Sequence, residues 1–331
     1  MARLAIGVDF GGTKVLASVV DVDSGKIRGT GKKKTDPNDG PDELMSRIYE
    51  VARKAVSKSG AEMSDMVGVC VGIAGQVDTE RGILVGTANL SRSVVDLQMA
   101  RLLEEELGIP AIIRNDVQIA AAGENRFGAG KDVDDFVVIF VGTGIGGGIV
   151  RDGQIIKGSA GNAGELGHTT VDANGRICGC GGRGHLEAYA SRTGMTRALW
   201  GEIRRGRSSV LSKLLPHVDP ADPATAPIKS SVIRKALEED DAVVREIVEE
   251  GGRYLGLGLA NVVNFLNPTR IILGGGVVES LDLFFDVAEQ ETRKQSLAHA
   301  GEAVQIVRAG LGDFSGVVGA AVLAADAAAG S

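Results

Sequence analysis

Apolar and polar positions alternate along the chain in blocks that predict strands and helices. Residues 4–20 (LAIGVDFGGTKVLASVV) and 136–150 (FVVIFVGTGIGGGIV) each consist of an apolar, β-branched run, a Gly/Thr turn and a second apolar run. This is the pattern of strand, tight turn and strand. A glycine-containing turn follows each segment, at 23–25 and at 152–153, so both predict the start of an antiparallel meander. The likeness of the two segments indicates an internal duplication, with a change of domain near residue 115.

The remaining apolar patterns predict a chain in which strands alternate with helices. Further strands are expected at 66–73, 111–114 and 269–273, and helices at 42–59, 96–107, 116–127, 186–198, 230–237, 242–265 and 315–329. Residues 217–229 hold three of the eight prolines and predict a surface loop. Alternating strands and helices indicate an α/β fold.

Length, charge and cysteine content exclude several classes of protein. A chain of 331 residues suggests about two domains. Its net charge of −7 argues against a nucleic-acid partner, which requires a basic face. No apolar run approaches the ~18–20 residues of a membrane span, and the first one reaches Asp9 before a signal-peptide core could form. Three cysteines are too few for a disulfide framework, so we expect a cytoplasmic protein without a membrane partner.

The glycine-rich turns resemble two nucleotide-binding motifs without matching their context. Residues 7–14 (GVDFGGTK) nearly fit a P-loop, but Thr13 and Lys14 stand in reverse order and a strand follows. Gly142, Gly144 and Gly147 fit G-x-G-x-x-G, but again a strand follows where a dinucleotide site needs a helix.

Two hairpin turns of this composition can instead offer backbone N–H groups and threonine hydroxyls to phosphates. Asp9, at the end of the first strand, could hold Mg²⁺ through water. A further glycine run, Gly274 to Gly276, follows a predicted strand. One such hairpin alone would indicate only a tight turn, whereas two hairpins and this run favour phosphate binding.

Cysteines and histidines converge in one glycine-rich segment, 168–187. His168 precedes Cys178 and Cys180, and His185 follows them. Two thiolates and two imidazoles are a known tetrahedral shell for Zn²⁺. A C-x-C disulfide is strained, and redox catalysis usually uses C-x-x-C. Cys70 lies in an apolar strand and is expected to be an inert core residue.

Two carboxylates accompany these ligands. Glu165 and Glu187 stand on a loop that zinc would hold in place, where they could accept hydrogen bonds from the hydroxyls of a sugar. The alternative is that both are ordinary solvated acids.

These motifs resemble those of the ROK family (repressors, open reading frames and sugar kinases), and the resemblance covers nearly the whole chain. The family pattern E-x-G-H followed by C-x-C-G-x-x-G-C-x-E corresponds to ELGH at 165–168 and CGCGGRGHLE at 178–187. His185 stands where the family has a third cysteine. DFGGTK at 9–14 and GTGIG at 142–146 resemble the two phosphate motifs of the actin-like ATPases. The chain is most similar to the family's glucokinases.

The resemblance implies a two-domain actin-like (ribonuclease H-like) fold with an inter-domain cleft, and transfer of the γ-phosphoryl group of ATP to the 6-hydroxyl of an aldohexose, glucose first. It implies Asp116 as the catalytic base, with ATP, Mg²⁺ and structural Zn²⁺ as cofactors. Asn115 and Asp116 are also well suited to cap the helix that follows, and both roles can coexist. The implied sugar-binding residues are Gly75, Asn89, Asn115, Asp116, Glu165, His168 and Glu187. The implied nucleotide-binding residues are Asp9, Gly11, Gly12, Thr13, Lys14, Gly142, Thr143, Gly144, Gly274, Gly275 and Gly276, and the metal ligands are His168, Cys178, Cys180 and His185.

The resemblance also implies a discontinuous smaller domain, 1–115 with 313–331, and a larger domain, 116–312, as well as a homodimer or homotetramer. The family usually has Pro-Asn-Leu and then a tryptophan where this chain has Ala88, Asn89, Leu90 and Arg92. N-acetylglucosamine, N-acetylmannosamine, mannose and fructose therefore stay open as substrates. A DNA-binding repressor would need a helix-turn-helix module before the first phosphate motif, which begins within ten residues of Met1. A non-catalytic sugar sensor is a further alternative.

Overall fold

The chain forms two compact units, which the computed structural model describes for residues 2–12, 14–36, 38–86, 93–159, 161–218 and 227–330. Unit 1 comprises Met1–Val138, Gly148–Gly164 and Ala309–Ser331. Unit 2 comprises Ile139–Gly147 and Glu165–Arg308. Each unit is therefore discontinuous in the sequence, and the chain passes between them more than once.

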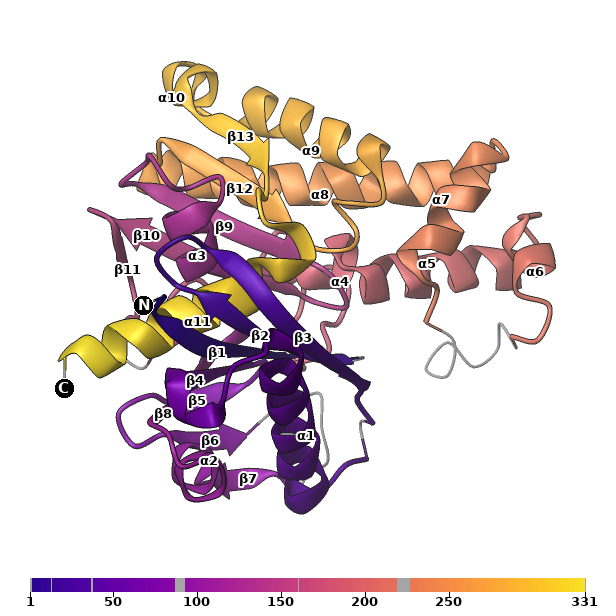
Figure 1. Cartoon of the computed structure of the whole chain (residues 1–331). Coiled ribbons are helices and arrows are strands. Elements are labelled where there is room, and N and C mark those ends of the chain that lie inside the picture. The colour runs from indigo at the N-terminus through magenta and orange to yellow at the C-terminus, as the bar shows by residue number, and fades with distance from the viewer. Residues whose placement is uncertain are drawn as a thin grey trace. The chain divides into compact units, whose positions relative to one another are not determined.

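A five-stranded sheet forms the centre of unit 1 (Figure 1). Its strands are β1 (Leu4–Phe10), β2 (Lys14–Asp21), β3 (Lys26–Lys34), β4 (Met66–Ile73) and β8 (Ala111–Asn115), in the order β3-β2-β1-β4-β8. The first three strands form the predicted antiparallel meander, and β4 and β8 run parallel to β1. Three short strands, β5 (Gln76–Asp78), β6 (Ile83–Gly86) and β7 (Val95–Leu97), form a small separate sheet.

Helices cover both faces of this sheet. Alternate residues of β1 face opposite sides, as the two-residue period of a strand requires. Ile6, Val8 and Phe10 belong to one buried cluster, which also contains residues of α1 (Pro41–Ser59) and α2 (Met99–Leu107). Ala5 belongs to the other, with residues of α3 (Asp116–Phe127) and α11 (Ser315–Gly330). The sheet is thus the middle layer of three.

The second five-stranded sheet repeats the order of the first. Its strands are β9 (Phe136–Val141), β10 (Ile145–Arg151), β11 (Gln154–Ile155), β12 (Arg270–Gly274) and β13 (Gln305–Arg308), in the order β11-β10-β9-β12-β13. Again an antiparallel meander precedes two further strands, which confirms the predicted duplication and the α/β fold. The helices of unit 2 are α4 (Glu187–Ala190), α5 (Arg192–Arg204), α6 (Leu211–Leu214), α7 (Ser230–Glu238), α8 (Ala242–Leu266), α9 (Asp282–Gln295) and α10 (Ala298–Ala303). Short 3₁₀ helices occur at η1 (Met63–Asp65), η2 (Leu166–His168) and η3 (Gly312–Phe314).

Two local predictions were wrong. The helix expected at 96–107 begins only at Met99, because Val95–Leu97 pairs with β6 as β7 and Asp96 has a positive φ of 50°. The helix expected at 186–198 is broken at Ser191, whose side-chain oxygen accepts a hydrogen bond from Gly194 N (3.0 Å) and so starts α5 afresh. The helix α9 was not predicted.

The carboxylate of Glu124 on α3 joins that helix to the segment that leads into α11. It is fully buried and accepts hydrogen bonds from the backbone N–H groups of Ala129 (2.7 Å), Gly310 (2.9 Å) and Leu311 (3.0 Å) and from the hydroxyl of Ser315 (2.7 Å). Consequently α3 and α11 both belong to unit 1. The domain boundaries predicted from the sequence, with 116–312 as one domain, stay a prediction, and the compact units differ from them by placing α3 with α11.

Among the described residues, one helical stretch, Gly312–Gly330, is long and apolar enough to span a membrane by length and composition alone. More than half of it is buried in the protein, and Val317, Ala320 and Ala321 have no exposed surface. Its apolar character is thus explained by its place in the core of unit 1.

We expect Glu124→Gln to destabilise unit 1 by about 2–4 kcal/mol. The amide lacks the charge and can accept through only one oxygen, so buried N–H groups lose their partner. Hydrogen exchange of 315–325 and the denaturation midpoint measure the effect. Glu105→Gln is the control, because Glu105 is exposed and pairs with Arg101 one helical turn away. Equal protection in both variants would contradict this role of Glu124.

Candidate functional site

The polar residues of unit 1 that the sequence singles out gather where its parallel strands end. Register pairs Phe10 with Ile73 and Ile73 with Asn115, so β1, β4 and β8 end at the same edge of the sheet. We call this the carboxyl edge. In open α/β sheets, ligands bind at this edge. Of the predicted residues, Asp9, Gly11, Gly12, Lys14, Gly75, Asn115 and Asp116 lie in or directly beside these strand ends.

Asp9 is the most perturbed acid at the carboxyl edge. Burial and, to a lesser extent, the negative charge of Asp116 raise the pKa of its carboxyl to about 7, while Lys14 acts in the opposite direction. A Cβ added to Gly316 would come within 2.9 Å of Asp9 Oδ2, so the carboxylate lies against the first turn of α11. A carboxyl whose pKa is raised by burial and by a second carboxylate favours a bound cation or proton.

Asn115 confirms the capping role and also reaches a second predicted residue. Its Oδ1 accepts a hydrogen bond from Val117 N (2.9 Å) at the start of α3. Its Nδ2 donates to the carbonyl of Gly75 (3.5 Å). Asp116 Oδ1 also accepts from Val117 N (3.0 Å) and holds its half-buried carboxyl at the helix start. The helix therefore fixes both residues at the carboxyl edge.

Lys14 has a partner that the sequence did not indicate. Its Nζ donates to Asp313 Oδ2 (2.8 Å), almost three hundred residues away in η3. The segment that leads into α11 thus supplies Asp313 and Gly316 to the carboxyl edge. No local pattern marks this pairing, because it depends on α11 packing against β1.

In unit 2, the turn between β9 and β10 contains Gly142, Thr143 and Gly144, which we call the second hairpin. Glu187 Oε2 accepts a hydrogen bond from Ile145 N (2.9 Å), just after this turn. A Cβ on Gly144 would lie 2.4 Å from that same oxygen, so only glycine leaves room for the Glu187 carboxylate. The glycine run predicted to bind nucleotide lies beside this hairpin, since a Cβ on Gly275 would lie 2.6 Å from Val141 O.

The junction of α4 and α5 is hydrogen-bonded to the second hairpin. Arg192 N donates to Gly142 O (2.9 Å), and the Thr193 hydroxyl donates to Thr143 O (2.7 Å). Arg192 Nη2 donates to Thr143 Oγ1 (2.6 Å). Sequence reasoning missed Arg192. The only available signal was a basic residue directly after a serine helix cap.

The four predicted metal ligands come together in the Cys/His loop, which we define as residues 165–187. The ligand atoms of His168, Cys178, Cys180 and His185 all lie within 4.8 Å of one another. Cys180 Sγ is 3.2 Å from His185 Nδ1, and Cys178 Sγ is 3.8 Å from His168 Nδ1. Tetrahedral zinc with these ligands requires separations of about 3.3–3.8 Å, so the residues fit such an ion.

The environment of Cys178 explains why a cation would suit this cluster. Burial raises the pKa of its thiol to about 11. Its Sγ also lies 3.5 Å from Glu187 Oε1, which connects the cluster to the second hairpin. A thiol with such a pKa is protonated at neutral pH, and a bound metal ion deprotonates it. Cys70, in contrast, is buried in β4 with a pKa raised by burial to about 12, which confirms it as an inert core residue.

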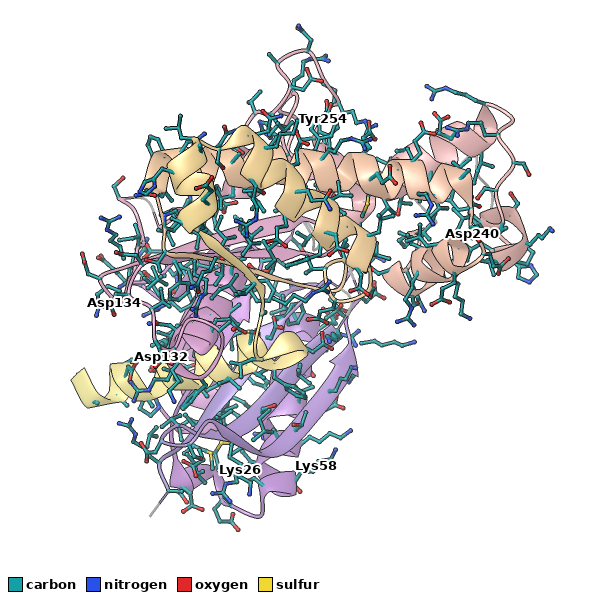
Figure 2. The ribbon with its side chains drawn as sticks, turned by 90° about the horizontal axis from the view of Figure 1, so that it is seen from above. Lys26, Lys58, Asp132, Asp134, Asp240 and Tyr254 are labelled. Carbon is teal, nitrogen blue, oxygen red and sulfur yellow. The ribbon has the colours of Figure 1, made fainter. Side chains whose placement is uncertain are left out.

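Aromatic and charged side chains fix the Cys/His loop on α8. The ring of Tyr189 stacks on that of Tyr254 at 3.9 Å, and its hydroxyl accepts from Arg176 N (2.7 Å). The Arg176 guanidinium lies over the Tyr189 ring and forms an ion pair with Glu250 (2.8 Å). Tyr254 is labelled in Figure 2. The loop has little regular structure, so its conformation depends on these side-chain contacts.

Two predicted residues lie outside the described part of the chain, Thr13 and Asn89, as does the segment 88–92. Glu165 is exposed, and its Oε2 lies 4.0 Å from His168 Nε2.

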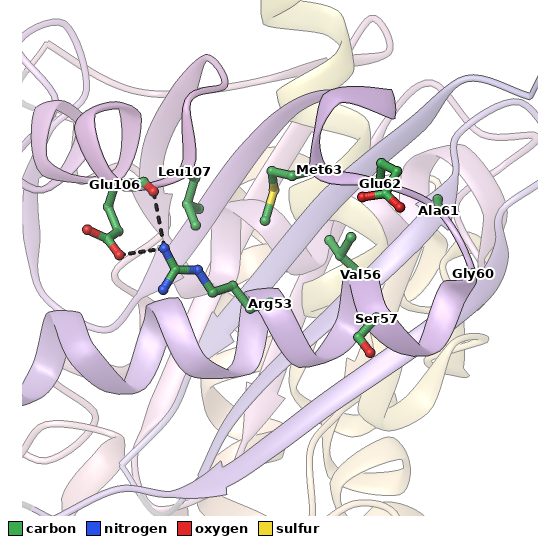
Figure 3. Close-up of a pocket in the computed structure, with 9 residues that line it drawn as sticks. All are labelled: Arg53, Val56, Ser57, Gly60, Ala61, Glu62, Met63, Glu106 and Leu107. Carbon is green, nitrogen blue, oxygen red and sulfur yellow. Dashed lines mark hydrogen bonds and ion pairs between the residues drawn. The ribbon is translucent and has the colours of Figure 1, made fainter.

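A groove of about 570 Å³ in unit 1 lies away from these residues. It is lined by residues from the C-terminal ends of α1 and α2 and from η1, including Arg53, Glu62, Met63 and Glu106. Figure 3 shows the Arg53–Glu106 pair across it. Because η1 precedes β4, the groove lies at the edge of the sheet opposite to the carboxyl edge. We assign it no role in the candidate site.

The two repeated sheets, each with a glycine-rich hairpin, define the two-domain α/β fold of the actin-like ATPases. The cysteine and histidine cluster, which Glu187 connects to the second hairpin, distinguishes this chain within that class of proteins. The chain belongs to the ROK family, whose model matches residues 5–327.

Individual relatives include both enzymes and repressors. The chain is 32% identical to a glucokinase of Halalkalibacterium halodurans, over 96% of this chain and 93% of that protein. It is similar to the crystal structure of a ROK family glucokinase from Streptomyces griseus in complex with glucose and AMPPNP, with a TM-score of 0.82, 33% identity, and coverage of 97% of this chain and 98% of that chain. It is also 28% identical to a xylose repressor of Bacillus subtilis, over 79% of this chain and 62% of the repressor.

We expect Asp9→Asn to stabilise the protein at pH 8 by about 1–3 kcal/mol, without magnesium or nucleotide. The folded state holds the Asp9 proton up to about pH 7, whereas the unfolded chain releases it near pH 3.8, the ordinary pKa of an aspartate. Stability of the wild type therefore falls between about pH 4 and pH 7, and the asparagine variant is spared this loss. Denaturation midpoints from pH 4 to pH 8 measure the difference.

Asp23→Asn is the control for this series, because Asp23 is exposed and pairs with Arg3 at the surface. If the denaturation midpoint of Asp9→Asn matched that of the wild type at every pH, the pKa of Asp9 would not be raised in the folded state.

Proposed function

We propose that this protein phosphorylates the 6-hydroxyl of an aldohexose with ATP and that glucose is the preferred sugar. The observation that supports this most directly is the placing of Asp116 at the carboxyl edge beside Asp9, in a chain alignable over nearly its whole length with ROK glucokinases. In the reaction, the sugar oxygen attacks the γ-phosphorus and the bond to the bridging oxygen of ADP breaks. The hydroxyl proton passes to a base.

Asp116 is the proposed base. Its half-buried carboxyl is fixed at the start of α3, and a carboxylate in this position accepts the proton as the sugar oxygen attacks. Phosphoryl transfer depends on positioning and on charge neutralisation more than on covalent steps. Asp9 would hold Mg²⁺ through water, and that ion would neutralise charge on the nucleotide's phosphates. The raised pKa of Asp9 supports a cation-dependent site.

The sugar-binding role rests on carboxylates, amides and one imidazole. His168 presents Nδ1 to Cys178 and Nε2 toward Glu165, which supports its double role, with one nitrogen on zinc and the other toward the 1-hydroxyl. Glu165 and Glu187 would hold the hydroxyls at carbons 1 and 2. Asn115 and Asn89 would contact the hydroxyls at carbons 3 and 4, and Gly75 would also bind the sugar.

The nucleotide-binding role falls on the glycine-rich turns. In unit 1 these are Gly11, Gly12, Thr13 and Lys14 beside Asp9. In unit 2 they are Gly142, Thr143 and Gly144 of the second hairpin, with Gly274, Gly275 and Gly276 after β12. The closeness of Gly275 to the end of β9 supports a common role for these two turns.

Zinc would be held by His168, Cys178, Cys180 and His185, whose spacing fits a tetrahedral ion. In this position it would be structural. Glu187 touches both the cluster and the second hairpin, so a bound metal ion would help to fix the residue that is proposed to bind the sugar. Histidine at 185 gives a Cys₂His₂ shell.

We also propose a cytoplasmic homodimer or homotetramer that binds only sugar and nucleotide, without nucleic-acid or membrane partners. ADP release with Mg-ATP across glucose, mannose, fructose, N-acetylglucosamine and N-acetylmannosamine tests the proposal. A preference for glucose is expected. Preference for an N-acetyl sugar would keep the reaction and change the specificity. No release with any sugar would favour a non-catalytic sugar sensor and refute the kinase.

We expect Asp116→Asn to lower kcat by about 10²–10⁴-fold, because the amide cannot accept the proton. The dissociation constant of the sugar should change little. Coupled measurement of ADP release gives kcat, and calorimetry gives the sugar affinity. An exposed aspartate of α9, Asp282→Asn, is the control. A kcat within twofold of the wild type would remove Asp116 from the reaction.

We expect the purified protein to contain about one zinc ion per chain and Cys178→Ser to lose most of it. Chelation should lower the melting temperature of the wild type, because the ion binds only the folded loop. Metal analysis by mass spectrometry gives the content. Cys70→Ala should keep its zinc, since Cys70 lies in β4. Zinc retained by Cys178→Ser at full stoichiometry would exclude this ligand set.

A further inference from the structure

Arg192 is the first residue of α5, and its guanidinium lies on the second hairpin. Its Nη2 donates to the side-chain oxygen of Thr143 at 2.6 Å. Its backbone N–H donates to Gly142 O at 2.9 Å, which fixes the start of the helix against the turn. All these residues belong to unit 2, so the arrangement does not depend on how the two units are placed.

The charge on this guanidinium is not balanced by any acid in the described part of the chain. Among the described residues, no carboxylate oxygen lies within ion-pair distance of Arg192. Arg176 and Arg207, which are also half-buried, differ: Arg176 pairs with Glu250, and Arg207 pairs with Glu202 and Glu246. Arg192 is half-buried, and burial lowers its pKa below the ordinary value, with no acid to offset that effect. A guanidinium has five N–H donors, and a cation held partly out of water without an anion is unfavourable.

The groups around this guanidinium suit the binding of an anionic ligand. The carbonyl groups of Gly142 and Thr143 are occupied by Arg192 N and by the Thr193 hydroxyl. The Thr143 oxygen accepts from Arg192, which leaves its own hydroxyl hydrogen free to donate. The N-terminus of α5, a helix of 13 residues, adds its positive end at the same place.

We propose that Arg192 is a phosphate-binding residue, whose guanidinium donates to a phosphate oxygen of the nucleotide held at the second hairpin. This inference rests on the proposed function, which places the nucleotide's phosphates at that hairpin, and it adds a side-chain cation to a turn otherwise made of glycines and a threonine. Arginine binds phosphate through two parallel N–H bonds and stabilises charge on the transferred group. No bond is made or broken at Arg192.

The test compares Arg192→Ala, Arg192→Lys and the control Arg197→Ala. Arg197 lies on the same helix and is exposed. We expect Arg192→Ala to lower kcat/KM for Mg-ATP about 10- to 100-fold, because charge-assisted hydrogen bonds to phosphate are lost. Its KM for the sugar and its melting temperature should stay near the wild-type values. Arg192→Lys, which keeps the charge but not the fork, should recover part of the loss, and Arg197→Ala should behave as the wild type.

Calorimetric titration with AMPPNP separates this inference from the proposed function. If the wild type phosphorylates no sugar, the proposed function fails, and weaker AMPPNP binding by Arg192→Ala would still support the phosphate contact. If the wild type is an active kinase and Arg192→Ala keeps kcat/KM for ATP and AMPPNP affinity within twofold, the contact is refuted. A loss in Arg192→Ala that extends equally to the sugar KM, and that lysine does not restore, would make Arg192 only a support of the hairpin and would also overturn the proposal.

Discussion

The buried carboxylate of Glu124 accepts hydrogen bonds from three backbone N–H groups and one hydroxyl, and the attachment of α11 to α3 depends on this. It closes the end of α3 and fixes the start of α11 with the same two oxygens. Because α3 begins with Asn115 and Asp116, the position of the proposed base depends on a helix that is anchored at its other end by Glu124. The same segment carries Asp313, which pairs with Lys14, and Gly316, which leaves room for Asp9. The Glu124 carboxylate thus connects the two segments that supply Asp116 on one hand and Asp313 and Gly316 on the other to the carboxyl edge.

In unit 2, the proposed site residues are held in place by a loop that has less regular structure. The Cys/His loop contains one 3₁₀ helix and depends on Tyr189, Tyr254 and Arg176 for its contacts with α8. Glu187 uses one carboxylate oxygen on Ile145 N and the other toward Cys178. A disturbance of the metal cluster would therefore be felt at the hairpin through a single side chain. The position of the loop relative to the hairpin depends on these two contacts of the Glu187 carboxylate.

Features that depend on local pattern could be predicted from the sequence, and those that depend on tertiary packing could not. The strand 66–73 and the helix 116–127 match β4 and α3, because apolar period and an Asn cap are properties of neighbouring residues. The metal ligands were recognisable because four of the scarce cysteines and histidines stand within 18 residues of one another. Asp313 and Arg192 carry no such signal. Each is an ordinary charged residue whose meaning comes from a partner brought to it by folding, Lys14 in one case and Thr143 in the other.

The place of α11 in the sequence affects how the protein can be made. The helix covers one face of the sheet in unit 1, where Ala5, Val20 and Cys70 pack on its small residues, yet the ribosome synthesises it after all of unit 2. Until residues 309–330 leave the exit tunnel, that face of the nascent sheet is covered only in part, by α3, although its strands are among the first to emerge. Unit 2 has every one of its residues available earlier. Its completion during translation therefore precedes that of the unit in which the chain began.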